Sequence, residues 1–314
     1  MKFAMFGIGG VGGFFAGLLV KAGLDVTFVA RGQTLAALRE KGLQVTSPLG
    51  DFSLPKVHAT GNPEEVTGID AVFVTVKAWQ VAEAAKQIRP MVGPDTMVVP
   101  LQNGVDAYGQ LAEVLGAQPV LGGLCHVIAY ATSPGCIKHM GLDPAITIGE
   151  WDNTRSARVD KLADCLRQAN FKVRVPENIQ VALWEKFLFL APLGAIGSVA
   201  RCPAGVMRTV PETRALLQAA MREIAVLARA YEIALPDGAV EKNWKMVEKI
   251  PAEATNSLQR DIMAERPSEL AALSGAVVRL AQAKGIPCPV HEFVYGALLP
   301  GEMRARTGQW NSGQ

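Results

Sequence analysis

The feature that most constrains the fold is a cluster of glycines near the start of the chain. An apolar run, Phe3 to Phe6, leads directly into Gly7-Ile8-Gly9-Gly10-Val11-Gly12. A helical pattern extends from Phe14 to Ala22, and a second apolar run covers Val26 to Val29. In this spacing the first glycine permits a tight turn, the second lets a phosphate approach the backbone, and the third lets the helix pack on the strand. The order strand, glycine turn, helix, strand therefore predicts a dinucleotide-binding turn, with phosphates at the helix N-terminus.

The same segment has a second interpretation as a signal peptide or membrane anchor. The stretch from Phe3 to Val20 carries no charge and lies between Lys2 and Lys21. Its clustered glycines make a poor membrane-spanning helix, and a dinucleotide turn accounts for them better. We therefore expect a cytoplasmic protein without a membrane segment.

The residue after the second strand distinguishes between cofactors. NAD-binding folds place an aspartate or glutamate there to bind the ribose hydroxyls. This chain has Ala30-Arg31-Gly32 instead, and a guanidinium is suited to bind a 2′-phosphate. The sequence thus favours NADP(H), while an ordinary surface arginine is the alternative.

Two later strands end in polar residues. Ala71 to Val76 is followed by Lys77, and Thr96 to Leu101 is followed by Gln102-Asn103-Gly104. A lysine or asparagine in such a place is usually a solvated turn residue. Ligands of open α/β sheets, however, bind outside the carboxyl ends of the strands, where Gly7 and Arg31 are also expected. We therefore predict functional roles for Lys77 and Asn103.

The rest of the chain predicts two domains. Further strands are expected at Val120 to Tyr130, Ala145 to Gly149 and Lys172 to Val175, which complete a Rossmann-type, doubly wound, mostly parallel sheet over residues 1–176. Residues 177–314 have the pattern of an all-helical domain, including a helix from Pro267 to about Lys284. A cleft between two such domains is a preferred site for a small molecule.

Lys186 is unusual in its surroundings, Trp184-Glu185-Lys186-Phe187-Leu188. Burial would disfavour the charged ammonium and make this lysine a better proton donor near neutral pH. The alternative is a lysine that extends its ammonium to solvent and pairs with Glu185.

Charge and cysteine content exclude several classes of function. With 31 basic and 29 acidic residues the net charge is only +2, which is no footprint for nucleic acid. The five cysteines form no C-x-x-C pair and their number is odd, so we expect reduced thiols rather than disulfides or a metal site. The apolar C-terminal helices are compatible with a homodimer.

At this point the chain resembles the ketopantoate reductase family (2-dehydropantoate 2-reductases). The resemblance is collinear up to about Glu302. It rests on the segments Gly7 to Gly12, Arg31, Val74 to Gln80, Gln102 to Gly104, Trp184 to Lys186 and Ser257 to Glu269.

The resemblance implies a reaction and roles for residues. NADPH would reduce the carbonyl group of a 2-oxo acid, with Lys186 as the general acid. Gly7, Ile8, Gly9, Gly10, Val11, Gly12, Arg31, Lys77, Asn103, Ile128 and Glu269 would form the cofactor site. Asn103, Lys186 and Ser257 would bind the substrate, and Ser257 would hold its carboxylate. From the sequence alone, Ser257 looks like a helix cap and Glu269 like a first-turn residue.

Three departures put the family's usual substrate in doubt. The family commonly has asparagines four, eight and eighteen residues after its catalytic lysine, where this chain has Leu190, Gly194 and Ala204. Reduction of ketopantoate to pantoate, in pantothenate biosynthesis, is the first expectation. The alternatives are a reductase of a more apolar 2-oxo or 3-oxo acid, and a non-catalytic NADPH-binding sensor.

Overall fold

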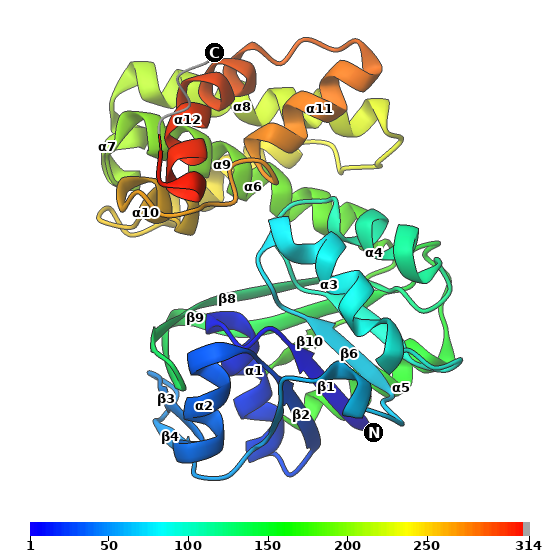
Figure 1. Ribbon diagram of the computed structural model, residues 1–314. Helices are drawn as coiled ribbons and strands as arrows, with labels where there is room; N and C mark the ends of the chain where they lie inside the picture. Colours follow the sequence, from blue (N-terminus) through cyan, green and yellow to red (C-terminus); the bar gives the residue numbers. More distant parts are fainter. Residues whose placement is uncertain (310–314) are drawn as a thin grey trace. The chain divides into compact units, whose positions relative to one another are not determined.

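The computed structural model describes residues 1–309, which fold as two compact units. The first unit comprises residues 1–102 and 107–180, and the second comprises residues 103–106 and the chain from 181 onward. The first is built of strands and helices and the second of helices (Figure 1). This confirms the predicted fold class of an α/β half followed by a helical half.

A parallel sheet forms the centre of the first unit. Its strands lie in the order β5-β2-β1-β6-β7, and every neighbouring pair is parallel. They are β1 (Lys2–Phe6), β2 (Asp25–Val29), β5 (His58–Thr60), β6 (Ala71–Val74) and β7 (Met97–Pro100). The chain builds outward from β1 first on one side and then on the other. Ligands of such sheets bind at this reversal, beyond the carboxyl end of β1.

The helices of this unit cover both faces of the sheet. They are α1 (Gly10–Lys21), α2 (Gly32–Lys41), α3 (Val81–Ile88), α4 (Ala107–Leu115) and α5 (Ala157–Arg167). Side chains alternate along β1, so Phe3 and Met5 join one core cluster while Ala4 and Phe6 join another. The first cluster contains the buried face of α1 and the second that of α3. Because β1 is buried on both faces, it is apolar throughout its buried length.

The remaining strands of this unit form a second, mixed sheet. It contains β3 (Leu43–Thr46), β4 (Phe52–Leu54), β8 (Gly122–Ser133), β9 (Cys136–Gly149) and β10 (Lys172–Arg174). Their order is β10-β9-β3-β4, with β8 antiparallel to β9. Neither β3 and β4 nor this separate sheet was predicted from the sequence. The strand predicted at Ala145 to Gly149 is only the end of the longer β9. The strand starts at Cys136 because alternating residues there, Ile137 and His139, are buried.

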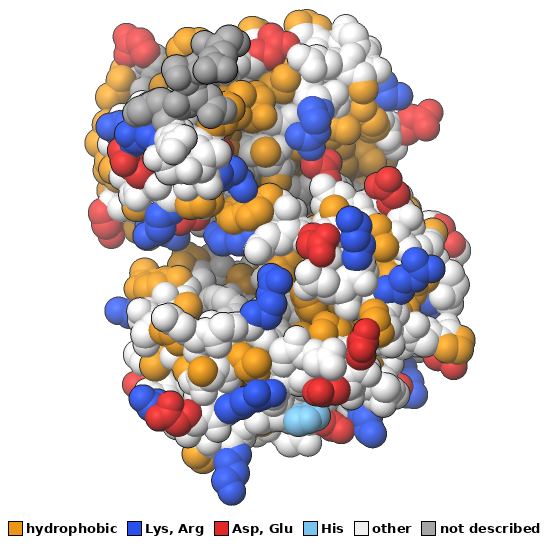
Figure 2. Space-filling view, in the orientation of Figure 1, with side chains coloured by type: hydrophobic (Ala, Val, Ile, Leu, Met, Phe, Trp, Pro, Cys, Tyr) orange, Lys and Arg blue, Asp and Glu red, His pale blue; other side chains and the backbone are white. Residues whose placement is uncertain are grey.

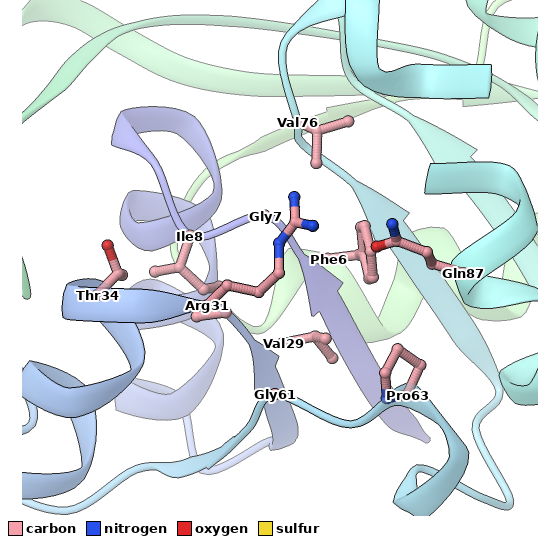
Figure 3. A pocket seen from close by; sticks show the side chains of 11 residues that line it. Phe6, Gly7, Ile8, Val29, Arg31, Thr34, Gly61, Pro63, Val76 and Gln87 are labelled. Carbon is pink, nitrogen blue, oxygen red and sulfur yellow. The ribbon is translucent and has the colours of Figure 1, made fainter. Parts of the chain in front are cut away.

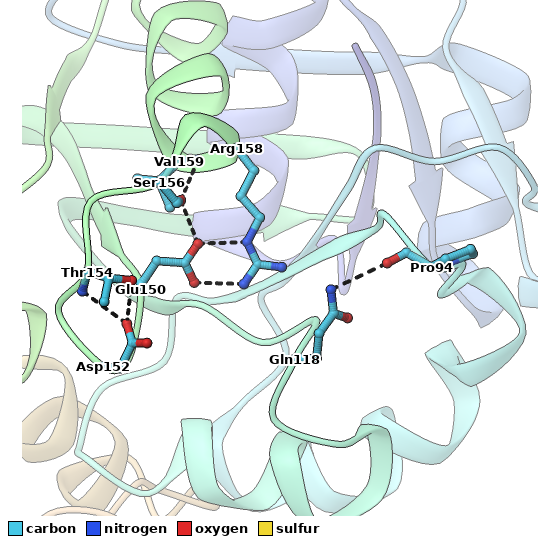
Figure 4. Close-up of polar contacts among 8 residues, drawn as sticks. All are labelled: Pro94, Gln118, Glu150, Asp152, Thr154, Ser156, Arg158 and Val159. Carbon is cyan, nitrogen blue, oxygen red and sulfur yellow. Dashed lines mark hydrogen bonds and ion pairs between the residues drawn. The ribbon is translucent and has the colours of Figure 1, made fainter.

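A buried carboxylate fixes the chain where β9 ends. Glu150 accepts hydrogen bonds from Nε and Nη2 of Arg158, both at 2.7 Å, and from the Ser156 hydroxyl at 2.6 Å (Figure 4). Burial opposes ionisation of this carboxyl, but Arg158 and Ser156 outweigh it and hold the pKa of Glu150 below its usual value. Ser156 also caps α5 by accepting from the Val159 N–H.

The second unit is a packed set of helices. They are α6 (Ile179–Ala200), α7 (Ala204–Thr209), α8 (Pro211–Ala230), α9 (Ala239–Lys249), α10 (Ser257–Met263), α11 (Ser274–Lys284) and α12 (Pro289–Thr307). The core includes Phe187, Leu188 and Ala191 of α6. Within the described chain α6 is long and apolar enough to cross a membrane, but 61% of its most apolar window is buried inside the protein. A core helix of a folded unit has these properties.

The predicted helix from Pro267 to Lys284 is wrong in its first turns. Regular helix begins only at Ser274, with α11. In a helix from Pro267, the carbonyl of Ser268 would accept the N–H of Ala272. Here that carbonyl accepts Nη2 of Arg306 at 2.9 Å, while the Ala272 N–H bonds to Glu269 instead. A tertiary contact therefore replaces the first turns of the helix.

The charged side chains of the molecule are mixed in sign. Figure 2 shows lysine and arginine side chains interspersed with aspartate and glutamate on the visible face. This distribution agrees with the small net charge of +2.

Candidate functional site

The glycine turn follows β1 directly and needs its first glycine. Gly7 has φ of +100°, and a Cβ there would lie 2.8 Å from the backbone nitrogen of Val76. Its N–H donates to the carbonyl of Val29 at 3.1 Å, so the turn is tied to the end of β2. A side chain at this position would be strained in conformation and blocked in space.

The third glycine of the motif allows α1 to start against this turn. A Cβ at Gly12 would overlap the carbonyl oxygen of Gly7 and the hydroxyl of Thr75. Gly9 is different, since a Cβ there would have nothing within 4 Å. Gly9 is the N-cap of α1, makes no side-chain cap, and is followed by no acidic residue in the first turn. The exposed N-terminus of α1 therefore has the character of an anion site.

Thr75 supports the turn and was not predicted. Its hydroxyl lies 2.6 Å from the carbonyl oxygen of Gly7 and 3.1 Å from that of Phe6, to which it donates. The available signal was a single polar residue within the apolar run Ala71 to Val76.

A pocket opens beside the turn, at the carboxyl ends of β1, β2 and β6. Figure 3 shows Arg31 reaching across it from the end of β2 toward Gly7 and Val76. In the described chain no carboxylate forms an ion pair with Arg31. The pocket is lined by Phe6, Gly7, Ile8, Val29, Ala30, Arg31, Thr34, Gly61, Pro63, Val76 and Gln87. The structure thus brings together Gly7, Ile8 and Arg31 from the predicted set and adds Thr34 and Gln87.

The other residues of the motif lie along the start of α1. Gly10 is packed so closely on the carbonyl of Ala129 in β8 that a Cβ would overlap it. This contact places the segment of β8 that contains Ile128 against the glycine turn. Val11 is half-buried and packs against the core beneath the turn.

Lys77 and Gln102 follow neighbouring strands. Lys77 is exposed, and its ammonium lies 5.7 Å from the centroid of the Trp79 ring. Gln102 is buried and its amide donates to the carbonyls of Val74 and Val76, at 2.8 and 2.9 Å. Gln102 therefore fixes the end of β6 and the residues that lead to Lys77 beside the end of β7.

Two predicted residues of the second unit are joined by a hydrogen bond. The amide of Asn103 donates to Oε2 of Glu269 at 2.9 Å, although 166 positions separate them. Glu269 is only 7% exposed. The two residues were predicted as separate site residues. In the structure the Glu269 carboxylate orients the Asn103 side chain.

Lys186 and Ser257 lie in different helices of the second unit. Lys186 is half-buried on α6, and the neighbouring Glu185 forms an ion pair with Lys242 at 2.9 Å. Ser257 is the first residue of α10 and is half-buried. The interpretation of Ser257 as the cap is wrong by one residue, because Asn256 accepts the N–H of Gln259 at 2.8 Å.

Two of the three positions that depart from the family pattern are closely packed. A Cβ at Gly194 would lie 2.9 Å from Cδ2 of Leu258, which occupies the space beside it. Ala204 is 3% exposed and Leu190 is half-buried. Apolar packing therefore takes the place of a polar side chain at Gly194 and Ala204, and Leu190 is itself apolar.

Comparison with known proteins gives one consistent result. The family model for ketopantoate reductase PanE/ApbA matches residues 3–153, and the model for its C-terminal part matches residues 178–302. A 2-dehydropantoate 2-reductase of Archaeoglobus fulgidus is 32% identical over 287 residues, covering 91% of this chain and 92% of that protein.

Solved structures agree with the family match. A PanE/ApbA family ketopantoate reductase from Ralstonia eutropha has a TM-score of 0.89 at 28% identity, over 98% of this chain and 100% of that one. A D-mandelate dehydrogenase solved with NADH and anilino(oxo)acetate has a TM-score of 0.89, over 98% of this chain and 99% of that one. At 19% identity this second likeness shows a shared fold.

The two glycines at the start of α1 give a matched test of the turn. We expect Gly12→Ala to lower the free energy of unfolding by about 1–3 kcal/mol, because the methyl group overlaps Gly7 and Thr75. Gly9→Ala should lower it by less than about 1 kcal/mol, since its methyl group enters open space and the only cost is the weaker N-cap preference of alanine. Urea unfolding followed by circular dichroism measures both, and equal losses in the two variants would contradict the packing described.

Proposed function

The chain belongs to the ketopantoate reductase family PanE/ApbA, a family of oxidoreductases, and we propose that it reduces a 2-oxo acid to a 2-hydroxy acid with NADPH. The membership confirms the resemblance seen in the sequence. Ketopantoate, reduced to pantoate in pantothenate biosynthesis, is the first substrate to test. The observation that carries the proposal is the position of Arg31, which reaches across the pocket at the glycine turn. An aspartate or glutamate in place of Arg31 would favour NADH.

The residues of the first unit fit a dinucleotide phosphate. Gly9 leaves open space above the N-terminus of α1, where backbone N–H groups can bind a pyrophosphate. The guanidinium of Arg31 offers a planar pair of donors to a 2′-phosphate. We assign Gly7, Ile8, Gly10, Val11, Gly12, Lys77 and Ile128 of this unit to the same cofactor site. The resemblance also implies contacts to the cofactor from Asn103 and Glu269, which belong to the second unit. The first unit is then the cofactor-binding domain.

The second unit then provides the substrate and catalytic residues. When bound, NADPH supplies the hydride. Lys186 donates a proton to the substrate oxygen as negative charge develops there, and its ammonium also stabilises that charge. Ser257 donates a hydrogen bond to the substrate carboxylate, and Asn103 orients the carbonyl group. A cytoplasmic location and a homodimer remain predictions from the sequence.

The first test measures cofactor preference. We expect Arg31→Ala to raise the Kd of NADPH by on the order of 10- to 100-fold, the effect of losing a hydrogen bond to a charged group. The Kd of NADH should stay nearly unchanged, because NADH has no 2′-phosphate. Isothermal titration gives both constants. Arg39→Ala, which removes an exposed arginine of α2, the helix that follows Arg31, is the control, and equal loss in both variants would count against a role for Arg31.

The second test concerns Lys186 and uses a panel of 2-oxo acids with NADPH absorbance as the signal. On the best substrate we expect Lys186→Ala to lower kcat by on the order of 10²- to 10⁴-fold, as for loss of a general acid. Lys245→Ala, at an exposed site on α9, should leave kcat unchanged. Full kcat in the Lys186 variant would show that this residue is not the proton donor.

A reductase of a more apolar oxo acid is the second candidate, favoured by the packing of Leu258 on Gly194. In that case the 2-oxo acid panel, extended to 3-oxo acids, should give a higher kcat/KM for a branched or aromatic substrate than for ketopantoate. Restoring asparagine at Leu190 and Ala204 should then bring no gain on ketopantoate. A clear gain would instead count against this second candidate and favour ketopantoate as the substrate.

A non-catalytic NADPH sensor makes the opposite prediction for turnover. It would show a rise in Tm on adding NADPH and no oxidation of NADPH with any oxo acid. The presence of Lys186 and Ser257 argues against a sensor, because binding NADPH alone needs neither a proton donor nor a group that holds a substrate carboxylate.

A further inference from the structure

A short segment in the first half of the sequence packs with helices of the second half. Residues 103–106 belong to the second unit although the chain on both sides belongs to the first. Gly104 has φ of +93°, and a Cβ there would lie 2.6 Å from the carbonyl oxygen of Ala272. With the hydrogen bond from Asn103 to Glu269, this brings the segment directly against residues 269–272.

Arg279 of α11 joins the same two segments from the side. Its Nη2 donates to Oδ2 of Asp106 at 2.6 Å, and its Nη1 donates to the carbonyl of Ala271 at 3.0 Å. Asp106 is half-buried, with 25% of its side chain exposed. The two nitrogens of one guanidinium therefore fix the spacing between the segment with Asn103 and the segment with Glu269.

The segment with Glu269 is also anchored from α12. The N–H of Ser268 donates to both oxygens of Glu302, at 3.0 and 3.1 Å, and its hydroxyl donates at 2.5 Å. Arg306 pairs with Glu302 at 2.6 Å and donates to the carbonyl of Ser268. Ser268 is fully buried, so this end of the segment is a rigid base. The contacts with Glu302 and Arg306 do not set the distance between the segment of Glu269 and the segment of Asn103. The two contacts of Arg279 bridge that distance.

We infer that Arg279 is a positioning residue, which holds Asn103 and Glu269 in hydrogen-bonding distance by bridging Asp106 to the Ala271 carbonyl. The consequence for catalysis rests on the proposed function, in which Asn103 contacts cofactor and substrate. In this inference Arg279 acts through the Asp106 carboxylate and the Ala271 carbonyl, and so through the two segments, rather than on a ligand. An exposed ion pair alone contributes little, but a guanidinium that also binds a backbone carbonyl restricts geometry.

The kinetic test compares three variants. Arg279→Ala should lower kcat/KM on the best oxo acid by on the order of 10- to 100-fold, the effect of a misplacement of about 1 Å at a site. Arg279→Lys keeps one contact and should recover part of this loss. Arg208→Ala removes an arginine that binds the Val247 and Ile250 carbonyls elsewhere in the unit, and serves as the control for general loosening.

A double-mutant cycle separates positioning from stability. If Arg279 acts through Asn103, adding Arg279→Ala to Asn103→Ala should change kcat/KM by less than twofold, because coupled residues are not additive. Independent, multiplying losses would overturn the inference. So would an Arg279→Ala protein whose Tm falls like that of Arg208→Ala while its kcat/KM stays at the wild-type value.

Hydrogen exchange tests the bridge without cofactor or substrate. In Arg279→Ala, amide exchange measured by mass spectrometry should quicken in peptides covering both 103–106 and 269–273. Faster exchange in only one segment, or in neither, would overturn the inference. If the wild-type protein oxidises no NADPH, the proposed function fails, yet this measurement still decides whether Arg279 joins the segments.

Discussion

The contact between the start of α1 and the end of β1 is the constraint on which the first unit depends. Gly12 is placed against the carbonyl of Gly7 and the hydroxyl of Thr75, so no side chain fits there. That contact fixes where α1 begins and directs its free N–H groups to the carboxyl edge of the sheet. The Gly7 N–H donates a hydrogen bond to the Val29 carbonyl at the end of β2. The same turn therefore also positions the backbone from which the Arg31 side chain extends. The close packing at Gly12 thus helps to determine the geometry of the pocket lined by Gly7 and Arg31.

Sequence reasoning succeeded where local pattern and burial agree. β1, β2 and β6 are buried on both faces, so their apolar runs were unambiguous. It failed where distant contacts decide local structure. The first turns expected after Pro267 are replaced by bonds to Glu302 and Arg306, which lie more than thirty positions away. In the second sheet, β3 and β4 were missed because they have only four and three residues. The existence of a separate sheet was missed because the pairing of its strands depends on contacts between distant segments.

In the site, too, individual residues could be predicted from the sequence, whereas the contacts between distant residues could not. Arg31 was predicted from its position after a strand, and the pocket places it beside Gly7 and Ile8. The pairing of Asn103 with Glu269 has no periodic signal, since 166 positions separate them. Thr75 had a weak signal, one polar residue in the apolar run Ala71 to Val76, and its role depends on the turn beside it. Motifs that act through backbone geometry can be found in a sequence, whereas side-chain pairs between elements need the fold.

The proposed chemistry and the identity of the substrate rest on separate residues. Lys186, Ser257 and Asn103 would act on the oxo and carboxylate groups that every 2-oxo acid shares. Leu190, Gly194 and Ala204 stand where the resemblance implies contacts to the rest of the substrate, and none of them offers a polar side chain. Three hydrogen bonds at about 1 kcal/mol each would amount to roughly a hundredfold in affinity or more. Because Leu258 fills the space beside Gly194, polarity there cannot be restored without changing the packing. Changes at these three positions can therefore alter which oxo acid is preferred while the groups proposed for the reaction remain in place.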